Sequence, residues 1–395
     1  MRVVEFTHMI MGPACGMALA ELGADVIKVE PPGGDKTRKL GGSGAGYFPM
    51  YNRNKRSVCL DIKTGAGKDA ALRLIDTADV FVENFRPGTM DRLGFGYEAL
   101  SQRNPRLVYC SEKGFLSGPY EKRTALDEVA QMMSGLAYMT GPPGRPLRAG
   151  ASVVDVQGAL FGALGVLAAL IERQTTGAGQ HVTASLFESA VFLVGQHMAQ
   201  LAVTGVAAQP MPARISAWAV YDVFETGDHQ SVFVGVVTDG QWATFCDAFQ
   251  LEALQTDDSL ARNSDRVGQR ERILPLIRQE FARYSLADLT AKLDRIGLPY
   301  APINRPEDLF EDPHLTAGGR LADRRSEPGL ADTPADAAGP VRRRGTGAAV
   351  RHSVGRGAHA GGTRRTGILR GRTPGNYQDL NHHRAIAARR TEQTR

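Results

Sequence analysis

The sequence predicts an α/β protein with a large domain on a parallel sheet and a smaller α+β domain after it. Two observations support this fold class. Strand-like and helical segments alternate along the first 110 residues, which is typical of a parallel, Rossmann-like sheet. Residues 216–237 then form two alternating strands around Gly227-Asp228, which predicts a hairpin and a change of architecture.

The chain opens with a predicted β-α-β unit. A strand at 2–6 leads to a helix at 12–22, with Pro13 in its first turn and Gly23 as its stop signal. A second strand at 25–30 ends at Pro31-Pro32-Gly33-Gly34. The unit therefore places two parallel strands side by side.

The alternation continues beyond this unit. The next predicted elements are a helix at 67–77, strands at 80–83 and 107–110, and a mostly helical region at 124–205 with one strand near 181–183. The smaller domain follows with helices at 240–249, 268–283 and 286–296 and a strand at 300–303. We expect domain boundaries at 1–200 and 201–320, and an atypical Arg/Gly-rich segment at 321–395.

Val156–Ile171 is uncharged, but it has only 16 residues and contains three glycines. We expect a buried helix rather than a membrane span. The N-terminus begins almost directly with a strand, so we expect no signal peptide. The four cysteines are scattered without a CxxC pair, which argues against a disulfide scaffold or a zinc ribbon and favours a reducing cytoplasm.

The formal net charge of +5 comes from the end of the chain. Residues 316–395 contain 16 Arg, no Lys and six acidic residues, whereas the first 315 residues carry 31 basic and 36 acidic side chains. The folded part is therefore slightly acidic, and we expect no nucleic-acid partner. The segment Gly12-Pro13-Ala14-Cys15-Gly16 lacks the glycine spacing of a dinucleotide fingerprint, which argues against a nicotinamide or flavin cofactor.

Asp155 directly precedes the uncharged helix predicted from Val156. The positive end of the helix dipole should favour its ionised form. An ionised carboxylate in an apolar setting can attack an activated acyl group and give a mixed anhydride. A plain helix-capping aspartate explains the same position.

Several basic residues lie where the predicted strands end. Arg86 and Arg92 lie just past the strand at 80–83, where they could bind phosphates or belong to a solvated helix. The basic run at 53–56, followed by Lys63, could complement a polyanion or form a solvated face. His8 follows the first strand, and no histidine pair outside the tail has metal-ligand spacing, so we expect no metal.

Taken together, these motifs resemble the class III coenzyme A transferases, the family of formyl-CoA transferase. The resemblance is carried by residues 5–35, 52–63, 82–95, 126–135 and 150–173, in this order, and covers about residues 1–315. It implies a large Rossmann-like domain, a small α+β domain and an interlocked homodimer. It also implies acyl-CoA and a small carboxylic acid as substrates, with no permanently bound cofactor.

The resemblance also implies residue roles. Asp155 falls on the nucleophile, which would form acyl-aspartyl anhydride and aspartyl-CoA thioester intermediates, and Asp127 on an acidic active-site neighbour. The CoA-binding positions fall on His8, Met9, Ile10, Leu60, Asp61, Ile62, Lys63, Asn84, Phe85, Arg86 and Arg92.

Two departures from the family pattern bear on the reaction. Ile10 stands where formyl-CoA transferases carry Gln, which favours a larger dicarboxylate or branched acyl group over formyl and oxalate. The related α-methylacyl-CoA racemases use a His-Asp dyad where this chain has Leu126-Asp127, and Leu cannot move a proton. We therefore favour a transferase; a racemase and an inactive CoA-binding homologue remain the alternatives.

Beyond about Leu321 the chain departs from the family. Arg and Gly rise while Lys disappears, as a shifted reading frame in GC-rich DNA would produce. We expect a C-terminal portion that is out of frame or strongly diverged. The alternative is a natural Arg/Gly-rich disordered tail that binds a polyanion.

Overall fold

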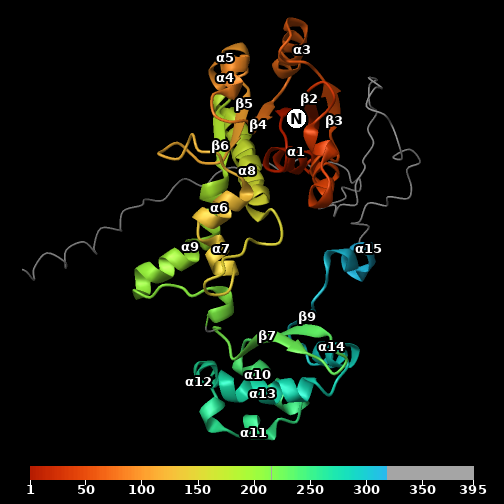
Figure 1. Cartoon of the computed structure of the whole chain (residues 1–395), viewed down its shortest axis with the longest axis vertical. Coiled ribbons are helices and arrows are strands. Elements are labelled where there is room, and N and C mark those ends of the chain that lie inside the picture. The colour runs from red at the N-terminus through yellow and green to blue at the C-terminus, as the bar shows by residue number, and fades with distance from the viewer. Residues whose placement is uncertain (215, 318–395) are drawn as a thin grey trace, which may run out of the picture. The chain divides into compact units, whose positions relative to one another are not determined.

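A computed structural model describes residues 1–214 and 216–317 (Figure 1). The predicted Arg/Gly-rich segment at 321–395 lies outside the described residues. Six strands form the main sheet: β1 (Arg2–Phe6), β2 (Asp25–Glu30), β3 (Arg56–Cys59), β4 (Val80–Glu83), β5 (Val108–Lys113) and β6 (His181–Ser185). Their order is β3-β2-β1-β4-β5-β6 and every pairing is parallel, which confirms the predicted α/β parallel sheet.

Consecutive strand residues supply two separate hydrophobic cores, because side chains alternate between the faces of a sheet. Val3 belongs to one core and Val4 to the other, and Val80 and Phe81 divide in the same way. The sheet is therefore covered on both faces, as parallel sheets require.

The helices of the large domain cover these two faces. They are α1 (Met11–Glu21), α2 (Tyr47–Tyr51), α3 (Gly65–Asp76), α4 (Thr89–Leu93), α5 (Tyr97–Arg103), α6 (Asp127–Met133), α7 (Leu136–Thr140), α8 (Val153–Thr176) and α9 (Leu186–Thr204). Helices α1, α6, α8 and α9 contribute to the core that contains Val3. Helices α3, α4 and α5 contribute to the core that contains Val4.

Helix α8 differs from its prediction in two ways. It begins at Val153 rather than Val156, so Asp155 lies inside its first turn. Its Gly158 and Ala159 side is buried, but Leu164 and Ile171 are 59% and 68% exposed, so only one side of the helix is buried. By length and composition alone, α8 and α9 could each cross a membrane. Helix α8 packs on α1, β5 and β6 as a core helix does, and its opposite face is apolar and exposed.

The smaller domain has its own core. Strands β7 (Val220–Glu225), β8 (Ser231–Val236) and β9 (Tyr300–Pro302) form an antiparallel sheet. Its helices are α10 (Asp239–Ala248), α11 (Glu252–Gln255), α12 (Asn263–Gly268), α13 (Arg270–Phe281) and α14 (Leu286–Arg295), and α15 (Pro313–Ala317) follows. A cluster from Ala219 to Leu298 fills the interior. The predicted hairpin and three long helices are confirmed; the boundaries at 200 and 320 stay predictions.

Candidate active site

The loops after β1 and β4 leave the sheet at its carboxyl edge, where the strand order reverses. β1 lies between β2 and β4. From β1 the chain continues outward to β2 and β3, and from β4 it continues in the opposite direction to β5 and β6. In parallel sheets such a reversal opens a crevice that binds ligands. The two loops carry the predicted residues His8–Ile10 and Asn84–Arg86.

Reciprocal hydrogen bonds join these two loops. The Asn84 Oδ1 accepts from the His8 backbone N–H at 3.0 Å, and the Asn84 Nδ2 donates to the His8 carbonyl at 2.9 Å. The rings of His8 and Phe85 lie 5.1 Å apart. A Cβ on Gly12 would lie 2.8 Å from Asn84 Cγ, so only glycine allows this close approach. The structure thus brings together His8, Asn84 and Phe85 as predicted.

The remaining residues of the loop after β1 differ in exposure. Met9 is exposed, adopts a left-handed φ of 62°, and its N–H donates to Thr37 Oγ1 at 3.2 Å. Ile10 is buried at the N-cap of α1. Ile10 therefore belongs to the core of the domain, and the exposed surface of this loop consists of His8 and Met9.

Asp155 lies at the N-terminal ends of two helices. It is the third residue of α8, whose N-cap is Ser152, so the alternative of a plain N-cap aspartate is wrong. Its side chain accepts a hydrogen bond from the backbone N–H of Met11, the first residue of α1. The carboxylate is thereby held next to the loop that contains His8.

Asp127 caps α8 in place of Ser152. Its Oδ2 accepts from the backbone N–H groups of Val154 and Asp155 at 2.9 and 3.0 Å. Gln131 donates to the other oxygen of Asp127 and accepts from the Ala149 N–H at 2.8 Å. Asp127 is buried, so this network fixes the backbone that carries Asp155.

The electrostatic surroundings oppose ionisation of Asp155. Burial, followed by the charges of Asp127 and Glu128, raises the pKa of Asp155 to about 7. The Arg148 guanidinium and the Met11 N–H act in the opposite direction. The helix dipole was expected to favour the ionised form of Asp155, but desolvation and a neighbouring carboxylate outweigh it.

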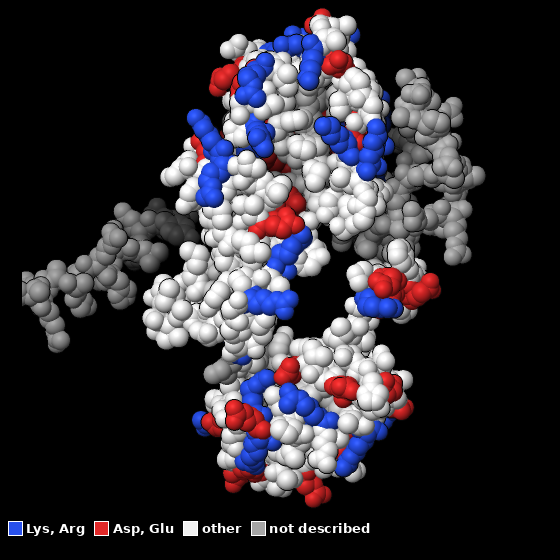
Figure 2. All heavy atoms as spheres, in the orientation of Figure 1, with Lys and Arg blue, Asp and Glu red and all other residues white. Residues whose placement is uncertain are grey.

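The predicted phosphate-binding residues lie on the surface around this edge. Arg86 and Lys63 are exposed. Arg92, on α4, is also exposed, and its guanidinium donates to Thr89 Oγ1 at 3.2 Å. Basic and acidic side chains are interspersed over the visible face of the described residues (Figure 2). Arg86, Arg92 and Lys63 therefore leave charged groups accessible to a ligand.

The predicted segment Leu60–Lys63 connects β3 to α3. Leu60 and Ile62 pack against the core, which leaves Asp61 and Lys63 as its polar members. Asp61 accepts from the Lys63 N–H at 3.1 Å and so shapes the turn.

Sequence reasoning missed the residues that support this site. Thr37 holds Met9, and Gln131 holds Asp127, through the bonds described above. Lys113, at the end of β5, donates to the carbonyl of Phe85 at 2.8 Å. The contacts of Thr37 and Lys113 join segments distant in sequence, and spacing gives no signal for them. Gln131 lies four residues after Asp127 in α6, a spacing that places two side chains on one face of a helix.

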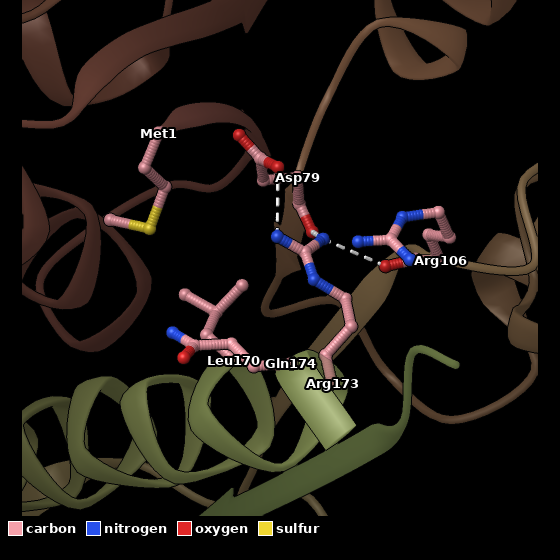
Figure 3. A pocket seen from close by; sticks show the side chains of 6 residues that line it. All are labelled: Met1, Asp79, Arg106, Leu170, Arg173 and Gln174. Carbon is pink, nitrogen blue, oxygen red and sulfur yellow. Dashed lines mark hydrogen bonds and ion pairs between the residues drawn. The ribbon is translucent and has the colours of Figure 1, made fainter. Parts of the chain in front are cut away.

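A shallow cavity of about 300 Å³ lies at the opposite edge of the sheet, lined by Met1, Asp79, Arg106, Leu170, Arg173 and Gln174 (Figure 3). The Arg173 guanidinium donates to the Asp79 carboxylate and to the Arg106 carbonyl, both at 2.9 Å. Asp79 and Arg106 precede β4 and β5. These groups join the amino ends of the strands and contribute nothing to the carboxyl edge.

Among residues 1–214 and 216–317, one group has the geometry to hold a metal ion: Cys15, Cys110 and Glu112, whose ligand atoms lie within 4.8 Å of one another. All three are buried. Burial raises the pKa of the Glu112 carboxyl well above its usual value. A raised pKa opposes metal binding, because a carboxyl group ligates a metal ion in its deprotonated form.

Comparison with known proteins identifies the family of this chain. The model of CoA-transferase family III matches residues 1–356. The chain belongs to this family, whose members are enzymes that transfer coenzyme A between acyl groups. The match passes residue 315, so the family pattern continues further than the resemblance predicted.

Individual relatives agree with this class. The chain is 35% identical to a succinate–glutarate CoA-transferase of Agrobacterium fabrum, over 83% of this chain and 85% of the relative. It is 34% identical to an acetyl-CoA:oxalate CoA-transferase of Acetobacter aceti, over 80% and 85%. The crystal structure of a CAIB/BAIF family protein from Brucella suis is 33% identical, with a TM-score of 0.75 over 89% of this chain and 95% of that one.

Proposed function

We propose that this enzyme moves CoA from an acyl-CoA thioester to a free carboxylic acid through covalent intermediates on Asp155. The Asp155 carboxylate attacks the thioester carbonyl, and the C–S bond breaks. CoA departs as a thiolate, and a mixed anhydride of Asp155 and the acyl group remains. The thiolate then attacks the aspartyl carbonyl, which releases the donor carboxylate and leaves an aspartyl-CoA thioester. The acceptor carboxylate repeats the two steps in reverse order and departs as the new acyl-CoA, which restores Asp155.

The observation that carries this proposal is the position of Asp155 beside the loop of His8, held by the Met11 N–H and by the Asp127 cap. A fixed, partly desolvated carboxylate is a better nucleophile than a hydrated one. The start of α1 supplies partial positive charge where negative charge develops during the attack.

The loops at the carboxyl edge supply the surface for CoA. Arg86, Arg92 and Lys63 are suited to its phosphates. Arg86 follows Asn84, whose side chain is bonded to the loop of His8 beside Asp155. CoA enters as a substrate, and we assign no permanently bound cofactor.

We propose a dicarboxylic acid as acceptor. Relatives are named succinate–glutarate CoA-transferase, succinyl-CoA:mesaconate CoA-transferase and succinyl-CoA–D-citramalate CoA-transferase. Each acid in these names carries two carboxyl groups. The half-buried Arg148, whose guanidinium already pairs with Glu128, lies near Asp155 and is a suitable partner for the second carboxylate.

The racemase alternative requires a proton-transferring group at position 126. Leu126 is the N-cap of α6 and 58% exposed, and its side chain carries no titratable atom. Uptake of solvent deuterium at the α-carbon of a 2-methylacyl-CoA, at a rate comparable to transfer, would support racemisation instead.

We further propose an interlocked homodimer with a Rossmann-like large domain in the cytoplasm. The parallel sheet order supports the Rossmann-like description. Helices α8 and α9 each have an exposed apolar face, and the ring centroids of Phe161 and Phe192 on them lie 5.4 Å apart. These faces support burial by a second copy of the chain. The free cysteines of the described residues support a reducing compartment.

Variants of Asp155 test the covalent mechanism. Asp155→Ala and Asp155→Asn should abolish transfer while CoA binding, measured by calorimetry, stays within about threefold. Hydroxylamine added during turnover of the native enzyme should convert Asp155 to a hydroxamate, which peptide mass spectrometry detects.

The matched control is Asp69→Asn, which removes an exposed carboxylate from α3, outside the proposed site, and should retain turnover. Near-normal transfer by Asp155→Ala would overturn the assignment. A panel of acyl-CoAs and mono- and dicarboxylic acids, read by mass spectrometry of the CoA products, identifies the substrates. CoA binding without any transfer would favour the inactive homologue.

A further inference from the structure

The loop after β4 is held by a buried ion pair that the reaction itself does not use. Glu83 is the last residue of β4, and Lys113 is the last residue of β5. Their side chains are 2% and 14% exposed, and Lys113 Nζ lies 2.5 Å from Glu83 Oε1. A pair this buried loses most of its hydration, so its presence needs a reason beyond mutual attraction.

Both members of the pair bind the same backbone unit. The Phe85 N–H donates to Glu83 Oε2 at 3.0 Å, and the Phe85 carbonyl accepts from Lys113 Nζ at 2.8 Å. Phe85 is thus fixed on both sides by charged partners, and charge-assisted hydrogen bonds are stronger than neutral ones.

The neighbouring residue is fixed as well. Asn84 makes the two reciprocal bonds to the backbone of His8. Residues 83–85 are therefore attached to the loop after β1 on one side and to β5 on the other. Arg86 follows directly and is exposed.

We propose that Glu83 and Lys113 are a positioning pair that holds the Asn84–Arg86 loop in its CoA-binding conformation before substrate arrives. This inference rests on the proposed function, because it assigns that loop to CoA. An apolar pair of similar volume could fill the same space, but it could not bind both polar groups of Phe85. Preorganisation lowers the entropy cost of binding, so the pair acts on affinity for CoA rather than on the chemical step.

The test uses three variants, because removing one charge leaves the other buried and unpaired. The double variant Glu83→Gln/Lys113→Met is neutral, and its Gln oxygen can still accept from Phe85. Lys113→Met alone measures loss of the carbonyl contact. Lys113→Arg keeps a charge-bearing donor. Arg103→Met, which breaks the exposed Arg103–Asp76 pair, is the matched control.

We expect the double variant to raise the KM for the CoA donor and the Kd for free CoA by about 10-fold. Its kcat and its KM for the acceptor acid should change less than threefold. Lys113→Arg should recover most of the affinity, and Arg103→Met should behave as the native enzyme. Hydrogen exchange at the Phe85 amide should be faster in Lys113→Met or, if that variant does not fold, in the double variant.

A double variant that folds and binds CoA with native affinity would overturn the inference and leave the pair a structural role. A fall in kcat at unchanged CoA affinity would also overturn it. Failure of the native enzyme to bind CoA would overturn the proposed function, and with it this role for the pair. Calorimetry on the native enzyme separates these cases.

Discussion

Asp155 is held in an environment that disfavours its charge. The Met11 N–H orients the carboxylate, while burial and Asp127 raise its pKa to about 7. A nucleophile whose pKa is close to neutral pH is deprotonated in a large fraction of molecules and is weakly solvated. Asp127 contributes both to the geometry and to the pKa, because it caps the helix that carries Asp155.

The pH dependence of the reaction should report this pKa. In the proposed mechanism only the carboxylate form of Asp155 attacks, so kcat/KM should fall as the pH drops below about 7. Asp127→Asn keeps an oxygen that can accept from Val154 and Asp155 but removes the charge. We measure kcat/KM for the acyl-CoA donor as a function of pH. The acid limb of this profile, where kcat/KM falls with falling pH, should shift to lower pH in Asp127→Asn.

Glu128→Gln provides a graded comparison for this shift. Glu128 raises the pKa of Asp155 less than Asp127 does and makes no bond to the start of α8. Its acid limb should therefore move by a smaller amount. An acid limb unchanged in Asp127→Asn would show that Asp127 does not set the pKa of Asp155.

The raised pKa also predicts a change in stability. The native carboxyl keeps its proton up to about pH 7, whereas its ordinary value is 3.8, so the native state binds more protons between these values. The stability from this group is present at low pH and is lost as pH rises through the window. The free energy of unfolding of Asp155→Asn, relative to that of the native chain, should therefore be higher at pH 8 than at pH 4. The increase should be on the order of 2 kcal/mol after allowance for solvent screening.

Chemical denaturation at the two pH values measures this difference. Asp69→Asn, whose side chain is exposed on α3, serves as the reference. Equal stability differences for Asp155→Asn at pH 4 and pH 8 would contradict the raised pKa.

At the scale of elements, the site is made where strands end and helices begin. β1 leads into α1, β4 into α4 and β3 into α3. The β4–α4 and β3–α3 junctions bring Arg86, Arg92 and Lys63 to one edge of the sheet, and the β1–α1 junction brings His8. The long helix α8 supplies Asp155 from its first turn, so four elements must keep their relative positions for the reaction.

The cations of these junctions should act on CoA alone. Arg92→Ala and Lys63→Ala each remove a proposed phosphate contact, and such contacts are worth roughly 1.5–3 kcal/mol. The KM for the CoA donor should rise about 10- to 100-fold, with a smaller effect on the KM of the acceptor. Steady-state kinetics with both substrates varied measures the two effects. An unchanged donor KM in Arg92→Ala would exclude α4 from the CoA site.

At the scale of the whole molecule, the apolar outer faces of α8 and α9 predict association. Leu164→Asp places a charge on a side chain that is 59% exposed in the single chain, so it should not disturb the fold of the monomer. We expect this variant to lose the homodimer in light scattering coupled to gel filtration, and to lose activity with it. Glu172→Lys, a charged residue of the same helix, is the control. A native chain that is monomeric at micromolar concentration would contradict the proposal.

The sequence predicted most of the fold because its local signals agree with the tertiary structure. The strand at 25–30 and the helix near 12–22 follow from Pro13, Gly23 and the run of apolar residues between them. The smaller domain was predicted in the same way from its hairpin and three helices. The start of α8 was misplaced because Asp155 looked like an N-cap, whereas the cap comes from Asp127, which is distant in the chain.

The sequence by itself determined the order of strands and helices and, through its motifs, the family and the nucleophile candidate Asp155. Periodicity, turn residues and motif spacing are local properties that the chain carries before it folds. Only the tertiary structure decided that Ile10 is buried, that Asp155 has a pKa of about 7, and that Glu83 and Lys113 hold Phe85. The physical reason is that desolvation, charge–charge interaction and backbone contacts depend on neighbours that folding brings together from distant parts of the chain.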